Sequence, residues 1–330
     1  MIAMVLGLVV IAGVTSVFLA GQQSFRTNNA LAEVQDGSRI AFELMARDIR
    51  GAGLSSCDSS NGRIANVLTG GSANWFADWG NPVHGYPDGS TDPALSGITG
   101  AGAPVAGIPS LHIISAGSIN ATVSTTPSDV AANLRINQPS QDLHVGDIIV
   151  VCTLTGPQPH TSIVQITGPG QVGANVGGVV VVHNTGAPVS PGNCSKGLDY
   201  PTVCGANGST NLEPNSPISK VSAADWYIGT NAAGGKSLYR LTLNGFADIS
   251  ASPSGGTPQE MVRNVTGMQI TYLQPPNTAL VATGQVTDWS VITAVRVTLT
   301  LDSTFQRATV NAKPVERVYA ATTTIRNRVD

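Results

Sequence analysis

The sequence predicts an α+β fold in which one long N-terminal helix, half membrane-embedded and half amphipathic, packs on an antiparallel β-rich head. Three observations lead to this prediction. The first 21 residues are almost wholly apolar, the following stretch is amphipathic with helical spacing, and the remainder carries short β-branched runs bounded by glycine and proline. The predicted domains are the membrane half of the helix (1–24), its amphipathic half (25–52) and one β-rich globular head (53–330).

The opening segment, "MIAMVLGLVVIAGVTSVFLAGQQSF", contains no charged residue before Arg26. A bilayer span needs roughly 20 apolar residues, and this segment just meets that length. A cleavable signal peptide has a positive leading region and a shorter apolar core. A buried core helix is rarely so uniformly apolar over this length. The segment therefore predicts a membrane-inserted helix.

The amphipathic half shows an apolar face at spacings of three and four residues. That face comprises Leu31, Val34, Ser38, Phe42, Met45 and Ile49. Glu43 and Arg47 lie four residues apart and support a helix modestly, while Gly51 and Gly53 are typical of a helix C-terminus. No breaker separates the two halves. We therefore expect one continuous helix of about fifty residues, roughly 75 Å long at the α-helical rise.

The head contains clear strand patterns. They lie at 111–115, 147–154, 161–167, 178–184, 226–230, 237–244, 265–273, 294–301 and 317–325. In "AVRVTLTL" (294–301) the apolar residues alternate with arginine and threonine, which predicts a half-buried antiparallel strand on which the apolar face of the helix can pack. The segments 58–109 and 184–224 have little periodicity and are predicted to be long loops.

The four cysteines predict two disulfides if the head is extracytoplasmic. Cys194 and Cys204 enclose a short Gly/Pro/Asn loop, which favours a local bridge and leaves Cys57 to pair with Cys152, although three pairings are possible from sequence. There is no C-x-x-C motif and no histidine at metal-ligand spacing from a cysteine, so we expect no zinc site of this kind.

No motif points to catalysis, and we expect neither an enzyme nor a cofactor. "GPGQVG" (168–173) precedes a strand and contains a proline, which favours a hairpin loop over a dinucleotide site. The five histidines are scattered along the sequence, so they are predicted to be strand or loop residues. "DGSTD" (88–92) lacks the distal glutamate of a calcium loop and predicts a polar turn.

An aromatic cluster lies in the first predicted loop, at Trp75, Phe76, Trp79 and Tyr86. It could form an exposed recognition patch for a sugar or a protein, but a loop folded over its own small core is favoured. The chain has 11% charged residues and a net charge of −3, which argues against a direct nucleic-acid partner.

Several stretches resemble the PilW family of type IV pilus minor pilins. They are "ALAEVQDGSRIAFE" followed by "LMARDIRGAGLSSC", then "VRNVTGMQITYL", "DWSVITAVRVTLTLDS" and "TTTIRNRV". The resemblance covers both ends and the last third of the chain, but not 58–220. It implies an inner-membrane protein with a periplasmic head that helps prime pilus assembly. Its partners would be other minor pilins, the major pilin, a tip-associated adhesin, the inner-membrane assembly machinery and the lipid bilayer, in support of twitching motility and adhesion.

Members of this family begin with a basic leader ending in glycine, then an aromatic residue and a glutamate, and prepilin peptidase cuts after the glycine. This sequence begins downstream of those features. We expect that the translation start was assigned to an internal methionine; a trimmed chain or a degenerate copy are the alternatives.

The resemblance also implies that the membrane half packs against other pilin helices in a filament. We expect Gly7, Gly13 and Ser16 to permit close approach, and Phe18 to pack beside them. Two other functions remain possible, a J-type pseudopilin of a type II secretion system and a membrane-anchored periplasmic binding module.

Overall fold

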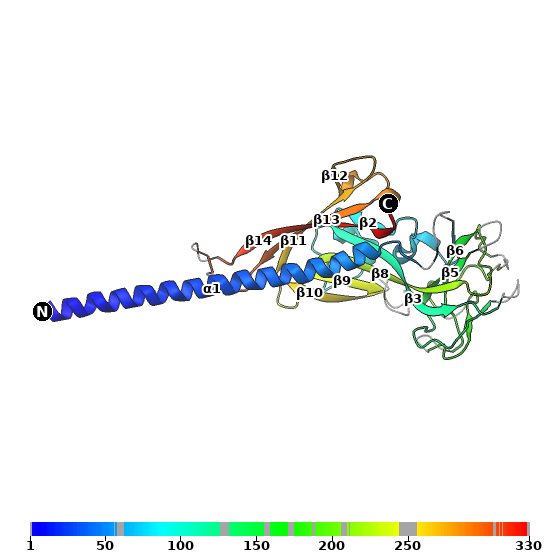
Figure 1. Ribbon diagram of the computed structural model, residues 1–330, viewed down its shortest axis with the longest axis horizontal. Coiled ribbons are helices and arrows are strands. Elements are labelled where there is room, and N and C mark those ends of the chain that lie inside the picture. The colour runs from blue at the N-terminus through cyan, green and yellow to red at the C-terminus, as the bar shows by residue number, and fades with distance from the viewer. Residues whose placement is uncertain are drawn as a thin grey trace.

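The computed structural model describes residues 2–55, 57, 63–125, 132–154, 159–170, 175–186, 189–205, 210, 212–243, 256–305, 308–309, 311 and 313–328. Within them lies one helix, α1 (Ile2–Gly51), which runs unbroken for 50 residues. Its first half projects away from the head, and its second half lies along the head (Figure 1). The prediction of one continuous helix is therefore confirmed. Beyond its end Gly53 adopts a left-handed φ of 70° and donates its backbone N–H to Ile114 O at 2.8 Å.

The strands make up most of the head. They are β1 (Ile64–Asn66), β2 (Val83–Tyr86), β3 (Ser110–Thr122), β4 (Asn133–Arg135), β5 (Ile148–Thr153), β6 (His160–Gln165), β7 (Val180–Val182), β8 (Pro217–Thr230), β9 (Lys236–Leu243), β10 (Gly256–Arg263), β11 (Val265–Leu273), β12 (Leu280–Ala282), β13 (Ala294–Asp302) and β14 (Glu316–Thr324). The α+β fold class predicted from the sequence is confirmed.

The larger sheet has the strand order β1-β6-β5-β8-β3-β2, and β8 also pairs with β9, which pairs with β10. All these pairs are antiparallel except β1 with β6. Strand β8 is shared along one side by two partners, since its first residues pair with β5 and its later residues pair with β9. Strand β3 follows its other side. These two long strands connect the part of the head beside the helix with the distal part (Figure 1).

The smaller sheet has the order β12-β11-β13-β14 and is antiparallel throughout. In β13 the valines and leucines at 295, 297, 299 and 301 are buried, and they share a core with Val34, Met45 and Ile49 of the helix. The predicted packing of the helix on this strand is therefore confirmed. The same core includes Trp226 and other residues of the larger sheet, so the helix and both sheets bury their apolar faces together.

A second core lies on the opposite face of the larger sheet and contains Trp75, Phe76 and Trp79. All three are buried, and Tyr86 is half-buried. The alternative of an exposed recognition patch is therefore wrong. The favoured interpretation is right that these aromatics are buried, but they share a core with the larger sheet instead of forming a small one of their own. A third core fills the distal part of the head around β5, β6 and β7.

The two segments predicted to be loops contain strands that the sequence did not reveal. The first holds β1 and β2, and the second holds the start of β8. Their patterns were weak because β1 has only three residues and because the start of β8 mixes serine and lysine with apolar residues. The stretch 168–173 lies partly outside the described residues; its Gly168 forms an antiparallel bridge with Val182, in keeping with a hairpin.

Gly85 of β2 lies close to Tyr272 of β11, in the smaller sheet. A Cβ added there would lie 2.8 Å from Tyr272 Cζ and 3.0 Å from Thr283 Cγ2. We predict that Gly85→Ala lowers the free energy of unfolding by about 1–3 kcal/mol, because the buried tyrosine must shift. Thermal unfolding of the full chain in detergent micelles would measure this. The matched control is Gly117→Ala in β3, where the added Cβ meets nothing within 4 Å; equal stability of the two variants would contradict the prediction.

Candidate assembly surface and helix–head junction

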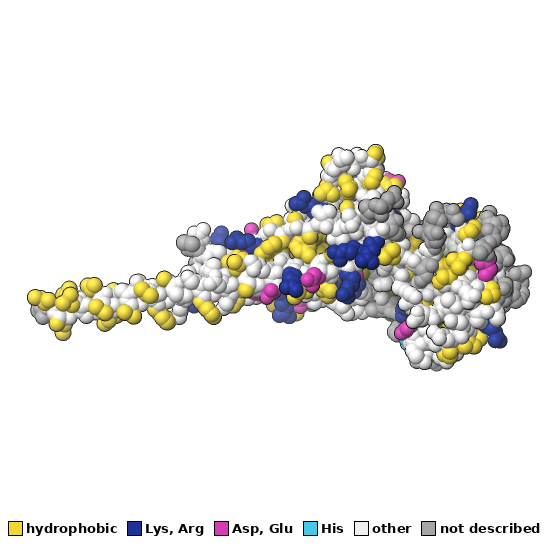
Figure 2. Space-filling view, in the orientation of Figure 1, with side chains coloured by type: hydrophobic (Ala, Val, Ile, Leu, Met, Phe, Trp, Pro, Cys, Tyr) yellow, Lys and Arg dark blue, Asp and Glu magenta, His cyan; other side chains and the backbone are white. Residues whose placement is uncertain are grey.

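The first half of α1 is exposed along its whole length. Its large apolar side chains are uncovered, for example Ile2 at 80%, Val17 at 73% and Phe18 at 62%. Figure 2 shows these side chains standing free around the helix, away from the head. Among the described residues this is the single helix long and apolar enough to cross a bilayer, and none of its apolar stretch is buried. A core helix of a soluble protein would be buried, so the segment suggests a membrane anchor or a signal segment.

The hydroxyl groups of Thr15 and Ser16, in the middle of this half, are satisfied within the helix. Thr15 Oγ1 donates to Ile11 O at 2.8 Å, and Ser16 Oγ donates to Gly13 O at 2.9 Å. These hydroxyl groups therefore need no water, which suits a helix placed in lipid. A Cβ at Gly7 or at Gly13 would meet no atom within 4 Å. The predicted role of Gly7, Gly13, Ser16 and Phe18 in close helix packing remains a prediction.

The second half of α1 docks on the head through a face made partly of small residues. Its buried residues are Ala30, Val34, Ser38, Ala41, Met45 and Ile49. Four of the six predicted residues lie on this face, whereas Leu31 and Phe42 are half-buried beside it. The sequence pattern favoured the larger apolar residues, but the helix comes close enough to the sheets to require small ones: a Cβ at Gly37 would lie 3.3 Å from Val262 Cγ1.

Asp48 joins the end of the helix to two strands of the larger sheet. Its Oδ2 accepts hydrogen bonds from Trp226 Nε1 at 2.8 Å and from Arg240 Nε at 2.7 Å, and its Oδ1 accepts one from Arg240 Nη2 at 3.1 Å. The guanidinium also lies 5.8 Å from the centre of the Trp226 ring. Such a two-pronged arginine–carboxylate pair fixes orientation as well as distance. Asp48 gives no signal in the sequence, because its partners lie on β8 and β9, far along the chain.

A second junction holds α1 near its middle, where the docked half begins. Glu33 Oε2 accepts hydrogen bonds from the backbone N–H and the hydroxyl of Thr304, at 3.0 and 2.9 Å. Thr27 Oγ1 donates to Ala308 O, and Ala30 shares a small core with Ala308 and Val315. The segment between β13 and β14 thus contacts the helix at the end of the head nearest the exposed half.

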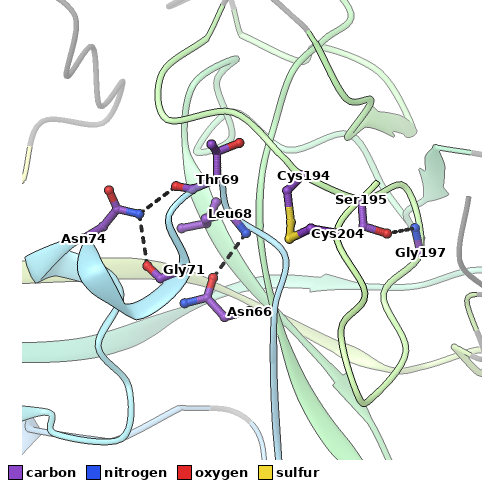
Figure 3. Close-up of a disulfide and its surroundings, with 9 residues drawn as sticks. All are labelled: Asn66, Leu68, Thr69, Gly71, Asn74, Cys194, Ser195, Gly197 and Cys204. Carbon is purple, nitrogen blue, oxygen red and sulfur yellow. Dashed lines mark hydrogen bonds between the residues drawn. A yellow bond between two sulfur atoms is a disulfide. The ribbon is translucent and has the colours of Figure 1, made fainter. Parts of the chain in front are cut away.

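Both disulfides are present with the pairing that the sequence favoured. Cys57 pairs with Cys152 across 95 residues and ties the chain beyond the helix to β5. Cys194 pairs with Cys204 across 10 residues and lies beside the turn that follows β1 (Figure 3). There the backbone N–H of Cys194 donates to Val67 O at 2.8 Å. Disulfides form and persist in oxidising compartments, so these two fit an extracytoplasmic head.

The described residues bring three ionisable side chains together inside the head. His112 Nε2 lies 2.7 Å from Asp92 Oδ1 and 2.5 Å from Asp225 Oδ2, and all three residues are buried. Ser110 donates its hydroxyl to Asp92 and not to the histidine, so the group lacks the nucleophile–base contact of a serine hydrolase. The predicted polar turn at 88–92 is confirmed as two successive 3₁₀ turns, capped by Asp88 and by Asp92.

Mutual charge and burial divide the protons among these three groups. Burial, then the charge of Asp92, raise the pKa of Asp225 well above its ordinary value. Burial tends to raise the pKa of Asp92 as well. Hydrogen bonds from His112 and Ser110 and the charge of His112 outweigh burial and hold the pKa of Asp92 below its ordinary value. Burial would lower the pKa of His112, but the charge of Asp225 and the close contacts of Nε2 with both carboxylates raise it to about 10. Two carboxylates this close cannot easily both be ionised without a further positive charge.

A free apolar half-helix that continues into a half docked on β-sheets is the arrangement of a pilin. The architecture is pilin-like. No protein-family model matches the chain, and a search of curated proteins finds no significant similarity. The pilin-like assignment therefore rests on the geometry of the helix and the head.

The Asp48 junction makes the first prediction of this region. Asp48→Ala removes the acceptor and leaves the partly buried Arg240 and Trp226 donors unpaired, so we expect a loss of about 2–3 kcal/mol in the free energy of unfolding. Urea unfolding followed by tryptophan fluorescence would measure it. The control is Glu43→Ala, which breaks an exposed pair with Arg39 and should cost less than about 0.5 kcal/mol. Similar losses for both variants would show that Asp48 contributes no more than a surface pair.

The two disulfides should differ in their effect on stability. Replacing Cys57 and Cys152 with alanine frees a loop of 95 residues, for which chain entropy gives a loss of about 4–5 kcal/mol. Replacing Cys194 and Cys204 frees a loop of 10 residues, with an expected loss of about 3 kcal/mol. Urea unfolding of both double variants would compare them. An equal or reversed order would mean that native-state contacts, and not loop closure, set the contribution.

Proposed function

We propose that this protein is a type IV pilus minor pilin of the PilW kind. It helps to prime pilus assembly and occupies a tip-associated complex with other minor pilins and the major pilin. The observation that carries the proposal is the apolar half of α1, which is fully uncovered and yet is a direct continuation of the docked half. Such a surface requires a bilayer before assembly and other helices after it.

The physical argument starts from what can cover this half-helix. Lipid tails cover it without cost, since they are as apolar as its side chains. Transfer from lipid to a helix bundle then gains little from the hydrophobic effect and depends on close packing, which small interface residues permit. Glycines at 7 and 13 and the serine at 16 supply such positions. Because the docked half is fixed by Asp48 and by the contacts of Glu33, the head is carried with the helix as one unit.

The proposed location is the inner membrane, with the head in the periplasm and later in the pilus. Two disulfides support an oxidising compartment for the head. In the proposed role the protein contacts the assembly machinery and a tip-associated adhesin and so supports adhesion and twitching motility. We propose no catalytic role, because the cluster of Asp92, His112 and Asp225 is enclosed in the head.

A J-type pseudopilin of type II secretion would have the same general architecture. The resemblance of "TTTIRNRV" and of the α1 segment to PilW-like proteins favours the pilus. The two roles differ in their cellular readout. Loss of a minor pilin lowers pilus number, whereas loss of a pseudopilin abolishes secretion of folded exoproteins.

The test uses two substitutions at Gly13 in the host cell. Gly13→Leu increases both apolarity and helix propensity, so insertion and folding are kept while close approach is blocked. We expect a several-fold loss of surface pili and of twitching. Gly13→Ala is the matched control, because it keeps a small side chain, and it should retain most pili. Immunoblots and secretion assays would accompany the pilus counts.

Three outcomes would count against the proposal. Normal piliation in Gly13→Leu cells would rule out this helix contact. Normal piliation after deletion of the gene would rule out a role in pilus assembly. A secretion defect with normal pili would assign the protein to the pseudopilins.

A further inference from the structure

The buried cluster lies on the face of the larger sheet that is turned away from α1. His112 of β3 is directly opposite Asp225 of β8 in the register of that strand pair. Asp92 reaches them from the junction of two 3₁₀ turns, Gly89–Thr91 and Pro93–Leu95. Its neighbours in this core include Trp75, so water has little access. The exposed fractions of the three residues are 2% for Asp92, 3% for His112 and 0% for Asp225.

One nitrogen faces two carboxylates in this cluster. A histidine Nε2 carries at most one hydrogen, and here it lies within 2.7 Å of Asp92 Oδ1 and 2.5 Å of Asp225 Oδ2. Among the described residues, neither oxygen of Asp225 has a hydrogen bond of ordinary geometry. Both carboxylates have the histidine as their only ion-pair partner in that part of the chain. Buried carboxylates are normally paired or bound to a metal. One imidazole N–H cannot serve both carboxylates at once, and a bound cation would satisfy both together.

We propose that Asp92, His112 and Asp225 bind one divalent transition-metal ion, Zn²⁺ or Mn²⁺, in the interior of the head. One ligand atom from each residue lies within 4.8 Å of the other two, so small side-chain movements place all three at the roughly 2.0–2.2 Å typical of these ligands to zinc. The mixed imidazole and carboxylate donors suit borderline ions. Calcium prefers six to eight oxygen ligands, which this enclosed cluster does not offer.

The surroundings of the cluster orient its ligands as metal sites require. Asp92 Oδ1 accepts a hydrogen bond from Ala94 N at 2.8 Å, and its other oxygen accepts one from the Ser110 hydroxyl. The rings of Trp75 and Tyr86 lie 5.2 and 5.1 Å from the imidazole of His112. Second contacts of this kind fix ligand orientation and are part of the affinity of a site.

The metal would join parts of the chain that are far apart in sequence. Asp92 lies in the segment between β2 and β3, whereas Asp225 lies in the middle of β8. The next residue, Trp226, points to the other face of the sheet and donates to Asp48 of the helix. Bound metal thus fixes β8 at the point where the helix is anchored. The proposed metal site does not depend on the pilus role, and it contains none of the cysteines on which the sequence-based argument against zinc relied.

The test measures metal in the full chain purified in detergent micelles. Mass spectrometry of the elements should give about one Zn²⁺ or Mn²⁺ per chain. Removal by a chelator should lower the Tm by at least about 5 °C. Addition of Zn²⁺ or Mn²⁺ should restore it, whereas Ca²⁺ should not.

Two substitutions connect the metal to these residues. Asp225→Asn and His112→Gln should each lower the bound metal at least tenfold. The matched control is Asp147→Asn. Asp147 is a buried carboxylate directly before β5 that pairs with Lys220 at 2.8 Å and lies outside the cluster. This variant should keep the metal. If a cluster variant does not fold, the chelator and re-addition experiment on the native chain decides the question alone.

Two results would overturn the proposal. The first is a native chain with less than about one tenth of an ion and a Tm that neither chelator nor added metal changes, in which case protons alone neutralise the cluster. The second is a folded Asp225→Asn or His112→Gln variant that keeps its full metal content, which would place the ion elsewhere.

Discussion

The structure depends on the contact between the second half of α1 and the core that both β-sheets share. Without the helix, the apolar sides of β13 and of the larger sheet would lose a common cover. The helix can approach closely because its docked face carries Ala30 and Ala41, with Gly37 beside it. Packing of this density is sensitive to single methyl groups, which is why small residues take positions on this face that the apolar pattern gave to larger ones.

Polar contacts set where along the helix this packing occurs. Apolar contacts are non-directional, so a helix could slide along the sheets by a turn at modest loss. Asp48 at one end and Glu33 at the other bind specific donors, on β8 and β9 and after β13 respectively. These two carboxylates therefore fix the register of the helix. These two contacts therefore determine how much of the apolar helix remains outside the head. That length in turn sets the distance of the head from a bilayer.

The features that the sequence predicted are those encoded locally. The helix follows from spacing within fifty residues, β13 follows from strict alternation, and the short disulfide follows from the proximity of Cys194 and Cys204. The features it did not predict depend on distant residues. In the sequence Asp48 is one of several charged residues near the end of the helix. Its partners Trp226 and Arg240 come beside it only through the folding of β8 and β9. His112 left a signal, a polar residue inside a predicted apolar strand, whereas Asp225 precedes the strand predicted at 226–230. Only the pairing of β3 with β8 makes them neighbours.

Strand β8 connects the anchor of the helix at Asp48 with the buried cluster. It pairs with β3, β5 and β9, so both ends of the head are continuous through it. Because successive side chains of a strand point to opposite faces, Asp225 faces the buried cluster while Trp226 faces Asp48. The position of the helix is thus set by the same few residues of backbone that hold the cluster. The distal part of the head is therefore connected to the helix anchor through one continuous strand, and not through a loop.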